Sequence, residues 1–409
     1  MEKKNRTDAD FEAAAESVRH VILNKRHLYK RKVTGQSKRI LLLVNHEVVI
    51  YNFRLELVER LLADGYEVHI STPPGKRIRK LKESGAVIHE ISFDRHGLNP
   101  GDELGIFIEY CRLIKRIQPV IVLGYTIKPN IYGAVAGRMC SVPFVANITG
   151  LGMAAGNGGM RQKASILLYR FAFGTKKGRI QRVFFQNKDN EEFFTKACIA
   201  IDKHGILPGS GVNLKRYKAS PLPVCGDGKK GEPVKFAFIS RIMAEKGIDQ
   251  YLDAAKAVKK IYSATEFHVC GFFEPEYNRQ HFDELNAARV IEFHGNIEDV
   301  GAFMSTVHCI VHPSYYPEGL SNVLLEAGAS GRPVITTDRA GCREAVEGNG
   351  YLVEEKSSGA LITAIKQFIE LDHKSRQDMA KAGRKLVEEK FDRQIIVNAY
   401  MNEIYKAEE

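Results

Sequence analysis

Short apolar runs alternate with amphipathic stretches from residue 38 onward, and this alternation predicts the fold. An apolar run of about 4–8 residues between turn residues is typical of a strand buried in a parallel sheet, and the stretches between such runs have the helical period. The pattern predicts two doubly wound α/β sheets, each with its binding crevice at the carboxyl ends of its strands. The predicted strands are 40–45, 67–73, 86–92, 120–126, 144–150 and 182–187 in the first half, and 235–242, 266–272, 290–295, 309–315 and 333–338 in the second.

A stretch rich in Gly, Pro and Lys (204–233) interrupts the pattern and predicts a linker between two domains. Helices are predicted at 53–65, 248–262 and 392–409. No strand follows the last of these, so we expect it to pack back on the first domain. The predicted organisation is an N-terminal arm (1–37), a first Rossmann-like domain (38–206), a second Rossmann-like domain (207–391) and the C-terminal helix (392–409).

The composition is that of a folded protein, with 44% hydrophobic and 27% charged residues. No apolar run approaches the roughly 18–20 residues that span a bilayer, and the first residues lack the apolar core of a signal peptide, which predicts a cytoplasmic protein. The seven cysteines form no Cys-x-x-Cys pair, and the sole Asp-x-Asp, at Asp8 and Asp10, lies in the polar arm. The sequence therefore predicts neither a metal ion nor any other cofactor.

The net charge of +11 is concentrated in two segments. Residues 1–39 hold eleven Lys/Arg against five Asp/Glu, and residues 161–188 hold eight Lys/Arg and no acidic residue. Because apolar residues such as Leu167 and Phe171 are interleaved with these cations, the second segment predicts a surface for anionic lipid, helped by the arm. The alternative is a core helix with a solvated basic face.

Candidate chemistry is concentrated in residues 311–338, where a strand, a Pro-Glu-Gly turn and a helix precede another strand. The helix start at Gly319, Leu320 and Ser321 is predicted to offer free N–H groups to a diphosphate. Glu318 lies at the turn and Glu326 eight residues later, about 12 Å along a helix, so two carboxylates could hold hydroxyl groups at both ends of one ligand. A solvated Glu at each position is the alternative.

This segment resembles the signature of the retaining GT-B glycosyltransferases of family four, in which the first Glu meets the donor sugar and the second meets the ribose. Residues 238–249 extend the resemblance, because Arg241 and Lys246 match the basic pair that binds the donor diphosphate in that family. The turn at 294–299 matches the place where family members hold the base, which implies main-chain contacts from Asn296 and Ile297. The implied donor is a nucleotide diphosphate-sugar, with a UDP-sugar expected and no metal.

The resemblance covers residues 38–409 and is strongest to bacterial transferases that extend undecaprenyl-diphosphate-linked sugars. It implies a GT-B fold, with an N-terminal acceptor-binding domain facing a C-terminal donor-binding domain across a cleft. It also implies a hexosyltransferase that acts with retention, at the inner face of the cell membrane, on a polyprenyl-diphosphate-linked acceptor. Residues 45–54 depart from the family's Gly-Gly turn. The candidate acceptor-binding residues are Asn45, His46, Asn52, Arg54, Thr149 and Gly150, although a polar loop that caps a helix explains the first four about as well.

Two other classes of function fit parts of the sequence. A nucleotide-sugar epimerase of the same shape would use the same donor crevice without a lipid acceptor, but the chain lacks clear acid–base partners for that reaction. A nucleic-acid-binding protein would account for the basic arm and the pI near 9.1, but no recognition motif accompanies the charge, and no nucleic acid is expected as a partner.

Overall fold

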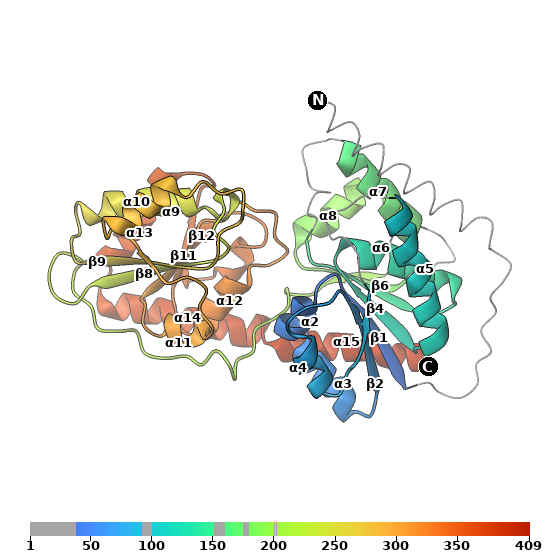
Figure 1. Cartoon of the computed structure of the whole chain (residues 1–409). Helices are drawn as coiled ribbons and strands as arrows, with labels where there is room; N and C mark the ends of the chain where they lie inside the picture. The colour runs from blue at the N-terminus through green and yellow to red at the C-terminus, as the bar shows by residue number, and fades with distance from the viewer. Residues whose placement is uncertain (1–37, 92–99, 151–159, 175–179, 200, 202) are drawn as a thin grey trace. The chain divides into compact units, whose positions relative to one another are not determined.

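The computed structural model describes residues 38–91, 100–150, 160–174, 180–199, 201 and 203–409, and the chain divides into two compact units (Figure 1). Unit 1 comprises Met1–Leu207 together with Ile396–Glu409, and unit 2 comprises Pro208–Ile395. Each unit has its own parallel sheet and its own core. The N-terminal arm lies outside the described residues.

Unit 1 is built on a seven-stranded sheet of order β3-β2-β1-β4-β5-β6-β7, in which every described pairing is parallel. The chain moves outward from β1 in one direction and returns to β4 on the other side, the double winding that the sequence predicts. The elements are β1 (Arg39–Leu43), α2 (Glu47–Phe53), α3 (Leu55–Ala63), β2 (Glu67–Thr72), α4 (Ile78–Glu83), β3 (Val87–Glu90), α5 (Pro100–Ile117), β4 (Ile121–Tyr125), α6 (Ile127–Met139), β5 (Phe144–Ile148), α7 (Met160–Phe173), β6 (Ile180–Phe185), α8 (Lys188–Lys196) and β7 (His204–Ile206).

Both faces of this sheet are covered, so its strands are buried on both sides. Leu41 and Leu43 of β1 lie in the core with α5, α6 and α7, whereas Ile40 and Leu42 lie in the core on the opposite face. The C-terminal helix α15 (Arg393–Glu408; Figure 1) belongs to that second core. Its Tyr400 is fully buried there. A helix at the end of the chain thus completes the core that the first strand begins.

Unit 2 repeats the plan with a six-stranded parallel sheet of order β10-β9-β8-β11-β12-β13. Phe236 and Phe238 of β8 pack in the core with α9 and α13, and Ala237 faces the core formed with α12 and α14. The elements are β8 (Val234–Ile239), the 3-10 helix η2 (Ala244–Lys246), α9 (Ile248–Lys259), β9 (Thr265–Cys270), α10 (Gln280–Ala287), β10 (Glu292–Phe293), α11 (Val300–Met304), β11 (Cys309–His312), α12 (Asn322–Ala329), β12 (Val334–Thr337), the 3-10 helix η3 (Arg343–Ala345), β13 (Gly350–Val353), α13 (Ser358–Glu370) and α14 (His373–Lys390).

The structure confirms the eleven predicted strands within a few residues and adds two, β7 and β13, each at one edge of its sheet. It corrects the predicted loop at 45–54, because residues 47–53 form helix α2. His46 caps this helix by accepting a hydrogen bond from the Val48 N–H at 3.1 Å, which confirms for this residue the alternative of a helix cap. The predicted helix 53–65 is confirmed as α3, within two residues at each end, and Arg54, with a φ of −138°, separates it from α2.

The apolar side chains of the basic segment 161–188 are largely core residues. Leu168, Tyr169 and Phe173 are buried in unit 1, whereas Leu167 is 53% exposed. The prediction that this segment inserts its apolar residues into lipid is therefore wrong for most of them. On α7 an exposed stripe of Lys163, Leu167 and Arg170 remains. None of the helices in the described part of the chain has both the length and the apolar character needed to cross a bilayer.

Candidate active site

The residues of unit 2 that are predicted to bind the donor lie together where the strand order of its sheet reverses. β8 and β11 are neighbours, but the chain visits β9 and β10 on one side of β8 before it returns to β11 on the other. Arg241 and Lys246 follow the carboxyl end of β8, and Glu318 follows the carboxyl end of β11. Ligands of open α/β sheets bind at this switch point, so topology brings together residues about 70 positions apart in the sequence.

Lys246 and Glu318 form a buried ion pair at this point. Their side chains are 10% and 14% exposed, which excludes the alternative of a solvated Glu318. Ser314 Oγ donates a further hydrogen bond to Glu318 Oε1 at 3.2 Å, and the His312 ring nitrogen Nε2 lies 3.7 Å from the same oxygen. Burial by itself raises the pKa of Glu318, but the Lys246 ammonium and His312 outweigh it and hold that pKa well below its usual range.

Arg241 lies beside this pair and forms an ion pair with a different carboxylate, that of Glu274. Its Nη1 donates to Glu274 Oε1 at 2.5 Å, and Glu274 follows β9, the next strand of the sheet. The Arg241 guanidinium and the Lys246 ammonium both lie over the Tyr316 ring, 5.5 and 4.9 Å from its centroid. One aromatic ring therefore holds two cations close together, an arrangement that suits a ligand with more than one negative charge.

A tight backbone crossing fixes the loop that carries Lys246. Gly247 has a φ of 79°, and a Cβ atom there would lie 2.1 Å from the carbonyl oxygen of Pro313. The Tyr315 N–H donates to the Glu245 carbonyl at 2.8 Å across the same crossing. Only glycine fits such a left-handed position against another backbone, so the Lys246–Glu318 contact depends on it.

Helix α12 begins at Asn322, four residues after Glu318. The estimate of 12 Å along one helix is therefore wrong, because part of the spacing between Glu318 and Glu326 is loop. Ser321 is the N-cap residue of α12, but its Oγ pairs with the buried His312 ring at 3.0 Å instead of capping the helix. The Ser321 N–H donates to the Gly341 carbonyl at 2.7 Å, so the prediction that it is free for a ligand is wrong. The N–H groups of the first residues of α12 itself lack partners within the helix and can serve an anion.

The carboxyl group of Glu326 is less solvated than its position on α12 predicts. Desolvation raises the pKa of its carboxyl group to about 7, while the Tyr217 hydroxyl and the Arg216 and Arg393 guanidinium groups oppose that shift. Tyr217 is itself buried. The carboxylate is thus placed to exchange its proton near neutral pH, and no sequence pattern predicts this.

The last two donor candidates follow the edge strand β10. Asn296 is exposed and Ile297 is partly buried, in the turn between β10 and the Asp299 cap of α11. They lie at the same carboxyl-end edge of the sheet as Arg241 and Glu318. Strand β9 separates β10 from β8, which precedes Arg241, and β11, which precedes Glu318, lies beyond β8. No hydrogen bond defines a base site there, so their role stays a prediction.

The acceptor candidates of unit 1 lie in four different environments, of which the last, that of Arg54, is buried. Asn45 and His46 follow β1 at the switch point of its sheet, and Thr149 and Gly150 follow β5. Asn52 Oδ1 accepts a hydrogen bond from Arg77 Nη1 at 2.9 Å.

Arg54 is the acceptor candidate that the structure makes unavailable. It is 3% exposed and lies between the rings of Tyr125 and Tyr400, at 5.2 and 5.5 Å from their centroids. Its Nη1 donates to the Phe53 carbonyl at 2.7 Å. Arg54 therefore supports the packing of α15 on β4 and presents no surface to a ligand.

Two family profiles match the two units. The profile "Glycosyl transferase 4-like" matches residues 39–187, and the profile "Glycosyl transferases group 1" matches residues 226–386, which contain the Lys246–Glu318 pair. The chain belongs to the GT-B glycosyltransferases.

Known relatives of this glycosyltransferase cover from about two thirds to most of its length. It is 25% identical over 373 residues to the N,N'-diacetylbacillosaminyl-diphospho-undecaprenol alpha-1,3-N-acetylgalactosaminyltransferase of Campylobacter jejuni, covering 86% of this chain and 94% of that protein. It is 24% identical to the UDP-Gal:alpha-D-GlcNAc-diphosphoundecaprenol alpha-1,3-galactosyltransferase of Escherichia coli, covering 63% and 68%. The structure of Anabaena HepE in complex with UDP superposes with a TM-score of 0.71 at 18% identity, covering 90% and 100%.

Sequence reasoning missed three residues that shape the glycosyltransferase site: His312, Glu274 and Tyr217. His312 and Tyr217 lie within strings that match the family, but a ring nitrogen or hydroxyl shows its partner only in the folded chain. Glu274 follows β9 after Gly271, and a carboxylate in a loop signals nothing by itself.

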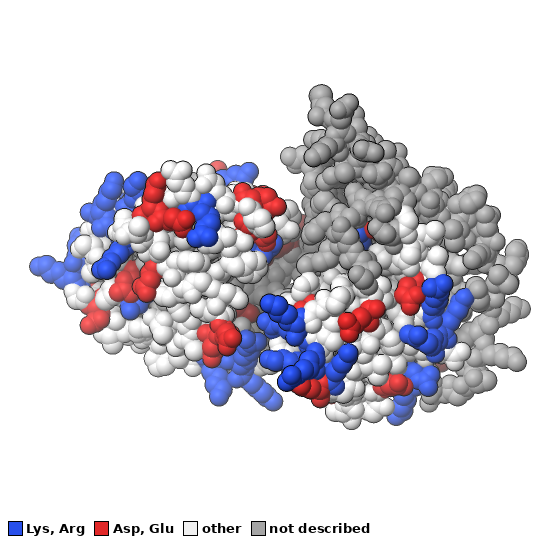
Figure 2. Space-filling model, in the orientation of Figure 1, with Lys and Arg blue, Asp and Glu red and all other residues white. Residues whose placement is uncertain are grey.

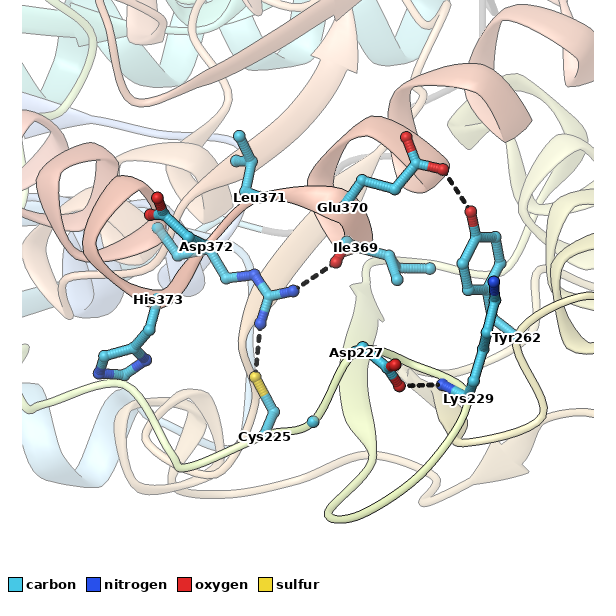
Figure 3. A pocket seen from close by; sticks show the side chains of 11 residues that line it. Cys225, Asp227, Lys229, Tyr262, Ile369, Glu370, Leu371, Asp372 and His373 are labelled. Carbon is cyan, nitrogen blue, oxygen red and sulfur yellow. Dashed lines mark hydrogen bonds between the residues drawn. The ribbon is translucent and has the colours of Figure 1, made fainter.

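A cavity of about 390 Å³ lies elsewhere in this glycosyltransferase (Figure 3). It is lined by residues before β8, such as Cys225, by Tyr262 after α9, and by residues at the junction of α13 and α14, such as Arg376. Arg376 is engaged in packing there, since it donates to Cys225 Sγ and to the Ile369 carbonyl, each at 2.6 Å (Figure 3). The cavity contains none of the predicted donor residues and lies near the amino end of β8, away from the switch point.

The two site carboxylates are expected to affect stability with opposite pH dependence. The pKa of Glu326 is raised from 4.5 to about 7, so the folded protein keeps a proton that the unfolded chain releases between these values. The stability contributed by Glu326 therefore falls as pH rises through that window and is constant above it. The pKa of Glu318 is lowered, so its contribution is present above pH 4.5 and is lost as pH falls below that value.

Unfolding of the wild type, Glu326→Gln and Glu318→Gln from about pH 4 to about pH 8 measures both effects. The difference in unfolding free energy between wild type and Glu326→Gln should decline toward pH 7. The difference for Glu318→Gln should stay level at neutral pH and shrink in acid. A Glu326 difference that is flat or grows with pH would contradict the environment described for that carboxyl group.

Proposed function

We propose that this glycosyltransferase moves a hexose or N-acetylhexosamine from a UDP-sugar to a lipid-diphosphate-linked saccharide, in the biosynthesis of a cell-surface glycan. The observation that carries the proposal is the meeting of Arg241, Lys246 and Glu318 at the switch point of the second sheet. Two cations beside a carboxylate and a helix N-terminus match the charges of a nucleotide diphosphate-sugar.

The two cations have a chemical task in this reaction. Breaking the bond between the sugar and its diphosphate leaves extra negative charge on the departing phosphate, and fixed positive charge stabilises that charge. Arg241 and Lys246 are held over Tyr316 and are therefore positioned before the donor binds. A diphosphate competes with Glu274 and Glu318 for these cations, and Glu318 remains near the sugar, where it accepts from hydroxyl groups.

Glu326 and the start of α12 have binding roles. Two ribose hydroxyl groups donate to the Glu326 carboxylate, and the N–H groups at the start of α12, directly after Gly319, Leu320 and Ser321, receive the diphosphate. The main chain of Asn296 and Ile297 holds the base. Binding a donor at Glu326 favours the ionised form of this carboxyl group. Because its pKa is near 7, loss of the proton at neutral pH costs little free energy.

The proposed acceptor is supported by the relatives and by the places that the candidate residues take within unit 1. The Campylobacter jejuni and Escherichia coli relatives are both named for diphospho-undecaprenol-linked sugars, and the similarity to the first extends over most of both chains. Asn45, His46 and Thr149 lie at the carboxyl ends of unit 1 strands, where an acceptor binds in a doubly wound sheet.

Retention of configuration belongs to the same proposal. It follows from the resemblance to family four, and it fits a reaction in which the leaving phosphate takes the acceptor proton on the same face of the sugar. No side chain of the enzyme is then needed as a base, and His46 serves as the cap of α2. The transfer step is also proposed to need no divalent metal, because Arg241 and Lys246 supply positive charge at the diphosphate.

Peripheral binding to the inner face of the cell membrane would bring the enzyme to a lipid-linked acceptor. The exposed stripe Lys163, Leu167 and Arg170 on α7 supports this location. A second group of cations lies on α4, where Lys80 and Lys82 are exposed. Figure 2 shows Lys and Arg side chains gathered on the visible face of this unit. Arg182 of the basic segment is not part of such a surface, because it pairs with the buried Glu403 at 2.8 Å.

The first test is transfer itself. A panel of radiolabelled UDP- and GDP-sugars is incubated with polyprenyl-diphosphate-linked sugars in EDTA, and the anomeric configuration of the product is read by NMR. We expect labelled lipid and free UDP, a retained configuration and undiminished turnover in EDTA. A loss restored only by magnesium or manganese contradicts metal independence. An epimerised nucleotide-sugar without lipid product contradicts the proposed reaction.

Donor kinetics separate the two kinds of contact. Arg241→Gln and Lys246→Gln should lower kcat more than they raise the donor KM, because their interaction strengthens as the phosphate departs. Glu326→Gln should act mainly on the donor KM, by about 1.5–3 kcal/mol, the range for a hydrogen bond to a charged group. Glu318→Gln should change both parameters.

Matched variants control for charge and folding in the kinetic test. Arg279→Ala and Glu389→Ala alter exposed residues of unit 2 and should leave kcat and KM unchanged. Lys246→Gln requires a folding check, since removing one partner of a buried ion pair costs about 3–5 kcal/mol. If all four site variants fold and turn over normally, unit 2 does not bind the donor.

Vesicle binding tests the membrane surface. Lys163→Glu combined with Leu167→Gln should weaken binding to vesicles that contain anionic lipid, and salt should weaken binding of the wild type. Lys374→Glu, an exposed charge reversal on α14, is the control and should have no effect. Release by Lys80→Glu with Lys82→Glu, but not by the α7 variant, would refute the assignment to α7.

A further inference from the structure

The edge of the second sheet carries a group of side chains that the proposed transfer reaction does not use. One ligand atom from each of His268, Glu292 and His294 can be chosen so that all three lie within 4.8 Å of one another. His268 Nδ1 lies 3.0 Å from His294 Nε2 and 3.5 Å from Glu292 Oε2, and His294 Nε2 lies 3.9 Å from Glu292 Oε1. Two ligand atoms on a tetrahedral zinc ion, each about 2.0–2.1 Å from the metal, are about 3.3 Å apart.

Strand register produces this convergence. His268 of β9 pairs directly with Glu292 of β10, so their side chains lie on the same face of the sheet. His294 follows Glu292 by two residues and returns to that face. Phe293, between them, points to the other face and packs on Phe282. The three ligands are therefore set by backbone pairing, which makes the site rigid along β9 and β10.

A second layer of contacts orients the His268 ring. Its other nitrogen, Nε2, lies 3.2 Å from Glu266 Oε2, and Lys235 Nζ lies 3.1 Å from the same Glu266 oxygen. A carboxylate on the far nitrogen of a histidine is the usual partner of a metal-binding imidazole, because it fixes the ring and its tautomer. Phe303 of α11 packs edge-on against both imidazoles, with centroids 6.0 and 5.1 Å from those of His268 and His294.

Unit 1 contains nearly the same arrangement without the third ligand. His69 Nδ1 lies 2.9 Å from His89 Nε2, and His69 Nε2 lies 3.2 Å from Glu67, which pairs with Arg39. The residue that pairs with His69 is Val87, where unit 2 has Glu292 opposite His268.

In unit 1 a guanidinium group also lies against the second ring nitrogen of His89. Arg116 Nη2 lies 3.3 Å from His89 Nδ1. A histidine pair at this position of the fold is thus compatible with a purely structural role, and the distinguishing feature of unit 2 is a carboxylate in the metal-facing position. The unit 1 pair provides an internal control.

We propose that His268, Glu292 and His294 bind one divalent transition metal ion, with zinc as the chemically best-matched probe. Two imidazoles and one carboxylate form a donor set that zinc takes in proteins, with a fourth position left for water. The ion would join β10, a strand of two residues at the sheet edge, to β9. Its role is to stabilise the fold, so the inference stands apart from the proposed transfer reaction.

Calorimetric titration of zinc into the full-length, tag-free and chelator-stripped protein tests the site. The wild type should bind a single equivalent that Glu292→Gln and His294→Gln weaken at least about tenfold, and Glu266→Gln should weaken binding by about 10–100-fold through the orientation of His268. His89→Gln, the matched change in unit 1, should bind zinc as the wild type does. Glu292 is 66% exposed, so its substitution leaves the core intact.

Two further readouts separate this site from adventitious binding. Zinc should raise the melting temperature of the wild type and not that of Glu292→Gln, because an ion bound only by the folded state stabilises it. Cobalt in place of zinc should show visible bands without the near-ultraviolet band of thiolate ligands, which distinguishes the site from the cysteines. Equal zinc affinity in wild type and Glu292→Gln, an equal loss in His89→Gln, or a thiolate band would overturn the proposal.

Discussion

The ion pair between Lys246 and Glu318 is the contact on which the active-site geometry depends. It joins the loop after β8 to the loop after β11, the two strands between which the winding of the second sheet reverses. A buried ion pair has little net stability to offer, because desolvation offsets most of the attraction. The presence of this ion pair at the switch point is better explained by a ligand, since a nucleotide diphosphate-sugar needs both a cation and a carboxylate there.

The surrounding backbone gives this pair a fixed geometry. Gly247 allows the Lys246 loop to approach Pro313 more closely than any side chain would permit, and the hydrogen bond from Tyr315 to Glu245 closes the crossing. Arg241, Lys246 and the ring of Tyr316 then form one group of charges over an aromatic surface. The cations are positioned by the fold before any donor is present, which is the condition for electrostatic catalysis.

Local sequence patterns predicted most of the fold, because parallel strands buried on both faces leave continuous apolar runs. Those patterns did not predict the edge strands β7 and β13, because their sequences, HGI and GYLV, are short and partly exposed. Helix α2 escaped it because the cap at His46 is a single polar residue whose role depends on the Val48 N–H. The burial of Leu168, Tyr169 and Phe173 escaped it because a basic helix can cover a core with one face and present its charges with the other.

The site was predictable only as far as a family signature names residues. Arg241, Lys246 and Glu318 were named by the signature, and topology brings them together. Their carboxylate partners, the raised pKa of Glu326 and the burial of Arg54 depend on three-dimensional environment, which no spacing along the chain encodes. The histidines of β9 and β10 illustrate the same limit, since 26 residues separate two rings that lie 3.0 Å apart.

Hydrogen exchange of the full chain with and without UDP tests the central claim most directly, because it locates a nucleotide without requiring the acceptor. If unit 2 binds the donor nucleotide at its switch point, UDP should slow exchange in the segments 241–247, 294–299 and 318–326. The segments after β1 and β5 of unit 1 should exchange as before. Protection confined to unit 1, or no protection in the loops after β8 and β11, would contradict the account.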